Sequence, residues 1–134
     1  MGRRMAQGFR VTITVTMPGQ IRGGKNHIII TRTGHRFPEK SWARWRDAMV
    51  CAVRSQIPRG HKPIDVPCAV ILNYTPEDNR RRDVPAILDA IWHVLEKAGA
   101  VSDDRWLGAA GLDYEAHPPD KAVACAVVSI TPAG

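Results

Sequence analysis

Residues 80–104 read RRRDVPAILDAIWHVLEKAGAVSDD, and this stretch contains the clearest helix signal of the chain. Its apolar side chains recur every three or four residues, which is the spacing of one helix face: Val84, Ile87, Leu88, Ile91, Leu95 and Ala98. Pro85 fits only in the first turn, because a proline further along would interrupt the backbone hydrogen bonds. Gly99 is a natural terminator. The stretch predicts a helix from about 84 to 98, followed by a turn with two adjacent aspartates.

The sequence on both sides of this helix predicts a second helix and five strands. The second helix covers about 40–56, where four apolar residues are spaced by three or four: Trp42, Trp45, Met49 and Val53. The strands are expected near residues 9–16, 27–31, 68–74, 106–116 and 122–131. The order strand-strand-helix-strand-helix-strand-strand contains no repeat and no linker. It predicts one α+β domain over residues 1–134, a mixed sheet with two main helices packed on one face.

Composition narrows the class of protein before any site is considered. The chain has 134 residues, 44% of them hydrophobic, which is enough for one core. No stretch approaches the roughly 20 apolar residues that span a bilayer, and the N-terminus lacks a secretory signal, so we expect a cytoplasmic protein. Its 19 Lys and Arg against 13 Asp and Glu give a net charge of +6, which suits a polyanionic partner such as DNA or RNA.

Carboxylates beside an arginine run are the strongest candidates for chemistry. The chain has no HExxH, no phosphate-binding loop and no nucleophile elbow. Asp83 opens the predicted helix directly after Arg80, Arg81 and Arg82, and Asp103 and Asp104 follow the helix. Carboxylates are ligands that Mg²⁺ prefers, and cleaving a phosphodiester requires cations along the backbone, so the set suits a nuclease. The alternative is that Asp83 only caps the helix and the acidic pair is solvated.

The same stretch resembles the central segment of RusA-type Holliday junction resolvases, whose pattern is RRRDxDNLxKxxxDxL followed by AGxxxDD. The lengths agree without a gap, and the positions that make the likeness specific are Arg81, Arg82, Asp83, Leu95, Ala98, Gly99, Asp103 and Asp104. A weaker likeness extends over most of the chain. The resemblance implies a homodimer that binds four-way DNA junctions and cleaves two strands with Mg²⁺ or Mn²⁺. It also implies that Asp83 is the first metal-binding aspartate and Asp104 the last.

Three functional groups of that pattern are missing. Pro85 stands where the pattern has a second aspartate, Ala86 where it has an asparagine, and Asp89 where it has a lysine. Either the site is lost and the chain binds DNA junctions without cutting them, or the missing carboxylate has moved to Asp89. Otherwise Asp89 is a surface residue paired with His93 one turn later.

Our sequence-based expectation is a Mg²⁺- or Mn²⁺-dependent DNA endonuclease that resolves four-way junctions in recombination and repair. The expected catalytic metal ligands are Asp83, Asp89 and Asp104, with Asp103 as a neighbouring ligand. The expected phosphate contacts are Arg22, Lys25, Arg80, Arg81 and Arg82, and Lys25 or one of the last three would replace the missing lysine. A non-catalytic junction-binding homologue is the alternative. A single-stranded RNA-binding module is disfavoured, because the strands lack paired aromatics that stack bases.

Overall fold

The sheet is built from four strands, and in three of them buried side chains alternate with more exposed ones. The structure, a computed structural model, describes residues 11–23, 28–30, 32–34, 36–38 and 40–133. The strand order is β1-β6-β4-β5, with bounds Ile13–Pro18, Cys125–Pro132, Cys68–Thr75 and Leu107–Ala116. β6 runs antiparallel to β1 and β4, whereas β5 runs parallel to β4. This confirms the predicted mixed sheet.

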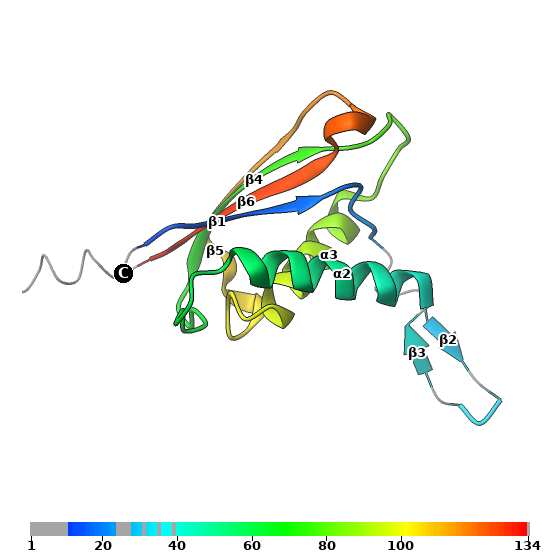
Figure 1. The fold of residues 1–134 in the computed structure, drawn as a ribbon, viewed down its shortest axis with the longest axis horizontal. Helices are drawn as coiled ribbons and strands as arrows, with labels where there is room; N and C mark the ends of the chain where they lie inside the picture. Colours follow the sequence, from blue (N-terminus) through cyan, green and yellow to red (C-terminus); the bar gives the residue numbers. More distant parts are fainter. Residues whose placement is uncertain (1–10, 24–27, 31, 35, 39, 134) are drawn as a thin grey trace, which may run out of the picture.

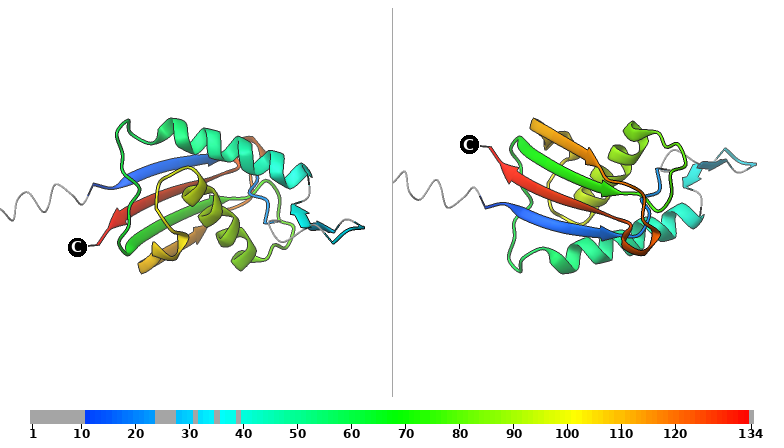
Figure 2. Two further views of the ribbon diagram at one scale, coloured as in Figure 1. Left: turned by 90° about the horizontal axis from the view of Figure 1, so that it is seen from below. Right: turned by 90° about the horizontal axis from the view of Figure 1, so that it is seen from above.

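Two helices cover the same face of the sheet (Figures 1 and 2). They are α2, Lys40–Gln56, and α3, Val84–Lys97. α3 connects β4 to β5, so these three elements form the parallel crossover unit in which a helix returns the chain across the sheet. The arrangement confirms a single α+β domain with two helices on one face.

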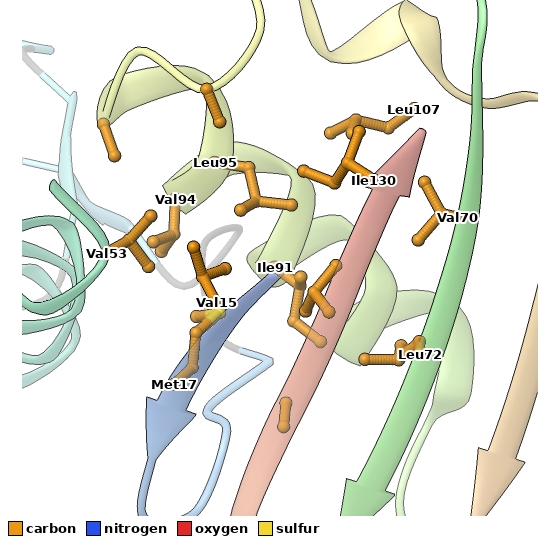
Figure 3. Packing of buried hydrophobic residues seen from close by; sticks show 14 of the residues in the cluster. Val15, Met17, Val53, Val70, Leu72, Ile91, Val94, Leu95, Leu107 and Ile130 are labelled. Atoms are coloured by element: carbon orange, nitrogen blue, oxygen red, sulfur yellow. The ribbon is translucent and has the colours of Figure 1, made fainter. Parts of the chain in front are cut away.

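The core lies between these two layers (Figure 3). Val53 of α2 and Ile91 and Leu95 of α3 are 0% exposed, and they face strand residues such as Leu72 and Ile130 that are equally buried. Burying an aliphatic side chain of this size contributes about 1.5–3 kcal/mol. Most of the apolar stripe read from the α3 sequence thus packs the helix on the sheet, whereas Val84 at its start is 39% exposed.

The C-terminal end of α3 is closed by a tight turn at Gly99. Gly99 has φ of +85°. The Ala100 amide donates to the Leu95 carbonyl and the Gly99 amide to the Glu96 carbonyl, both at 3.0 Å. This paired pattern is the Schellman motif, which favours glycine because the left-handed backbone disfavours a Cβ. The turn reverses the chain, which then forms the 3₁₀ helix η1, Asp104–Trp106, beside α3.

Some boundaries differ from the sequence-based expectation. The first strand begins at Ile13, and Val11, which we expected in it, is 62% exposed, while Phe9 and Arg10 lie outside the described residues. The expected strand near 27–31 is β2, Ile28–Ile30, and it pairs with an unexpected strand β3, Arg36–Pro38. A short 3₁₀ helix, η2, Lys121–Val123, precedes β6. Among the described residues, no helix is long and apolar enough to cross a membrane.

Candidate metal centre and nucleic-acid interface

Three half-buried carboxylates meet at the C-terminal end of α3. Glu96, Asp103 and Asp104 each offer an oxygen within 4.8 Å of the others. The Asp104 amide donates to Glu96 Oε1 at 2.8 Å, and the Asp103 carboxylate accepts from the Arg105 amide at 2.9 Å. Like charges at this separation repel one another, and a divalent cation with oxygen ligands relieves that repulsion. The cluster can therefore hold Mg²⁺ or Mn²⁺.

Glu96 was missed by the sequence reasoning. It sits on the last turn of α3, where the sequence alone marks it as one more polar helix residue. The Gly99 turn brings it to the aspartates by folding residues 100–104 back along the helix. The available signal was the spacing: a glutamate three residues before a terminating glycine, with two aspartates shortly after it.

Asp83 and Asp89 lie at the other half of α3. Asp83 occupies the N-cap position, with φ −81° and ψ 104°, and its carbonyl accepts the first helical hydrogen bond, from Ile87. Its side chain makes no capping hydrogen bond within the described part of the chain. A surface cavity of about 390 Å³ is lined by Asp83, Pro85, Ala86 and Asp89. The carboxylate of Asp83 is thus exposed beside Asp89.

The two acidic groups are separated by α3 itself. The helix is 14 residues long, which is about 21 Å at 1.5 Å per residue. Asp83 precedes it, whereas Asp104 is bonded to Glu96 near its last turn. The structure therefore brings Asp103 and Asp104 together with Glu96, and it does not bring Asp83 or Asp89 to them within one chain.

The arginine run divides into two exposed residues and one that stabilises its own loop. Arg80 and Arg81 are exposed. Arg82 donates to Asp78 Oδ1 at 2.7 Å and to the carbonyls of Asp78 and Arg80 at 2.9 and 3.0 Å. The Arg80 amide and the Arg82 guanidinium both donate to the Asp78 carboxylate and hold its pKa below the usual value. Arg80 and Arg81 are thus the better placed phosphate contacts.

The remaining expected DNA contacts precede α2. Arg22 is exposed, and its guanidinium donates to the Ser41 carbonyl at 3.1 Å and to its hydroxyl at 3.3 Å, so it joins the loop to the first turn of α2. Lys25 lies outside the described residues. Gly23 approaches α3 so closely that a Cβ there would lie 3.0 Å from Ala86. This contact places the loop beside Asp83.

A further cation lies next to the carboxylate cluster. The Arg105 guanidinium is 4.4 Å from the centre of the Trp106 ring, and its Nε is 3.7 Å from Asp103 Oδ2. The Trp106 indole donates to the Ser102 hydroxyl at 3.3 Å. Trp106 is half-buried and lies immediately before β5. Arg105 was not among the expected contacts.

No protein-family model matches the chain, and no curated protein matches it.

Proposed function

We propose that the chain is a Mg²⁺- or Mn²⁺-dependent endonuclease that acts on four-way DNA junctions in the cytoplasm, of the RusA type. The observation that carries the proposal is the cluster of Glu96, Asp103 and Asp104. Its two aspartates are those that the resemblance assigns to the end of the resolvase pattern, and Glu96 adds a third oxygen ligand. The net charge of +6 suits the polyanionic substrate.

The residues of the site have separate roles in phosphodiester hydrolysis. A divalent cation, when bound, supplies a Lewis acid that favours attack by water at the phosphorus. Glu96, Asp103 and Asp104 would hold it through carboxylate oxygens. Arg105, stacked on Trp106 and close to Asp103, presents a cation that can contact a phosphate oxygen. It thus offers a substitute for the lysine that the resolvase pattern has where Asp89 stands.

A homodimer would bring Asp83 and Asp89 close to the carboxylate cluster from which they are separated within one chain. A two-fold axis across the middle of α3 exchanges the ends of this helix, so Asp83 and Asp89 of one protomer would approach the carboxylate cluster of its partner. Partly exposed apolar residues, Val84, Leu88 and Trp92, recur every four positions along α3 between the two acidic groups. Such a stripe is suited to the centre of an interface. We therefore propose two composite sites per dimer.

The non-catalytic junction binder is the second candidate. Within one chain the first and last aspartates of the pattern lie at opposite ends of α3. Pro85 and Ala86 also remove two polar groups beside Asp83. A chain that kept its cations and lost its metal site would still bind branched DNA.

The test is cleavage of a labelled, mobile four-way junction with and without Mg²⁺ or Mn²⁺. We expect the wild type to cut, and Glu96→Gln and Asp104→Asn to lose cutting while they retain junction binding. Asp113→Asn is the matched control, because it removes an exposed carboxylate on β5 away from the cluster. Binding without any cut by the wild type would favour the junction binder. Failure to bind the junction would refute both candidates.

A further inference from the structure

A cavity of about 340 Å³ lies at the opposite end of the domain from the arginine run, where the loop after α2 meets the sheet. Residues from the start of β1, the end of β6 and the connecting loop line it. The apolar lining includes Ile13, Ile64 and Pro132, and the basic lining is Arg59, His61 and Lys62. Its volume falls within the range of about 300–1,000 Å³ that is usual for small-ligand sites.

The loop that carries the basic residues is fixed by hydrogen bonds on both sides. The His61 amide donates to the Pro58 carbonyl at 3.1 Å across a turn in which Gly60 has φ of +84°. The His61 ring bonds to the Ala100 carbonyl at 3.1 Å, so Nε2 is the donor. The Ile64 amide donates to the same carbonyl. The cavity therefore exists before any ligand arrives, which lowers the entropy cost of binding.

The chemistry of the lining selects an anion with an apolar body. Arg59 and Lys62 are exposed cations, and no carboxylate is among the described residues that line the cavity. An arginine and a lysine suit a phosphate, since both donate charge-assisted hydrogen bonds to its oxygens. The aliphatic floor provides a surface for a base or a sugar. We propose that this cavity binds a phosphate-bearing nucleotide of a DNA strand.

The position of the cavity links it to the carboxylate cluster. Ile64 forms a parallel bridge with Val101, and the Ser102 amide donates to the Ile64 carbonyl at 2.9 Å. The loop after α2 and the segment after α3 lie at one end of the domain in Figures 1 and 2. A strand held in the cavity would therefore continue toward Asp103 and Asp104. The claim that DNA supplies the nucleotide rests on the proposed function, whereas the claim that the cavity binds a nucleoside phosphate does not.

The direct test uses thymidine 5′-monophosphate as the probe, followed by amide chemical shifts of the metal-free protein. We expect shifts at Gly60, His61 and Lys62, and roughly tenfold weaker binding of thymidine, which lacks the phosphate. The double variant Arg59→Ala/Lys62→Ala should lose the response. Arg44→Ala/Lys121→Ala, which removes two exposed charges elsewhere, should retain it. Equal binding of thymidine, or an unchanged response in the first variant, would overturn the proposal.

The second measurement asks whether DNA supplies the nucleotide. Arg59→Ala/Lys62→Ala should weaken junction binding and reduce the slope of affinity against salt by about 2, because each phosphate contact releases about one counterion. An unchanged slope would overturn DNA as the source. Because the monophosphate experiment needs neither metal nor DNA, its result stands even if the wild type never cuts a junction. A result that overturns the cavity proposal can therefore be told apart from one that overturns the endonuclease proposal.

Discussion

Gly99→Ala tests the turn that builds the carboxylate cluster. Gly99 has φ of +85°, and a Cβ built there meets nothing within 4 Å, so the substitution introduces backbone strain without a steric clash. The strain of an L-residue in the left-handed region is about 1–2 kcal/mol, and alanine recovers about 0.4–1 kcal/mol by restricting the unfolded chain. The net loss in the free energy of unfolding should be about 1 kcal/mol.

For a chain of 134 residues, a loss of about 1 kcal/mol lowers Tm by about 3–4 °C. Thermal unfolding followed by circular dichroism measures it. Gly99→Asn should lose less, since asparagine tolerates the left-handed region better than alanine does. An Ala variant as stable as the wild type, or an Asn variant less stable than the Ala variant, would refute the claim that a left-handed turn at Gly99 positions Asp103 and Asp104.

Two further predictions concern the loop before α3. Arg82→Ala should lower Tm because it removes three loop hydrogen bonds. Arg81→Ala should leave Tm unchanged and reduce the slope of junction affinity against salt by about 1. Equal behaviour of the two variants would contradict the separate roles of Arg82 in the loop and Arg81 at the DNA. Because the pKa of Asp78 is lowered in the folded protein, its contribution to stability is present above the ordinary carboxyl pKa of 3.8 and is lost as pH falls through the folded-state pKa. Asp78→Asn should therefore make Tm less dependent on pH below about 4. The same dependence of Tm on pH in the variant and the wild type would show that the hydrogen bonds to the Asp78 carboxylate do not stabilise the fold.

The regular spacing of apolar residues identified the helices and strands that pack together, because burying one face of an element requires apolar residues at regular intervals. The buried residues of α3 and of α2 follow the 3.6-residue repeat of a helix face that packs on the sheet. Strand β3 escaped prediction because three residues, Arg36–Pro38, are too short for a pattern. The parallel pairing of β5 with β4 also depends on contacts far apart in the sequence.

The candidate site was only partly predictable for a related reason. Asp103 and Asp104 were found from their adjacency after a helix, but the approach of Glu96 depends on how the Gly99 turn folds the chain back. The role of Arg82 likewise depends on the loop conformation that brings Asp78 to its guanidinium. Charge and spacing identify residue types, whereas their partners follow from backbone geometry.

Mixing two inactive variants tests the composite metal site most directly. Asp83→Asn and Asp104→Asn should each fail to cut a four-way junction. When subunits exchange, a mixed dimer regains one site in which the unaltered Asp83 and the unaltered Asp104 meet, and random pairing gives about a quarter of the wild-type number of sites.

The proposal predicts that the mixture, once exchange is verified with differently tagged subunits, nicks one strand of the junction in the presence of Mg²⁺ or Mn²⁺. Glu96→Gln mixed with Asp104→Asn provides the control and should stay inactive, since both changes fall in the same half-site of the cluster. Restored nicking by the first mixture alone is the predicted result, and no cleavage despite confirmed exchange would contradict the proposed metal-dependent dimer.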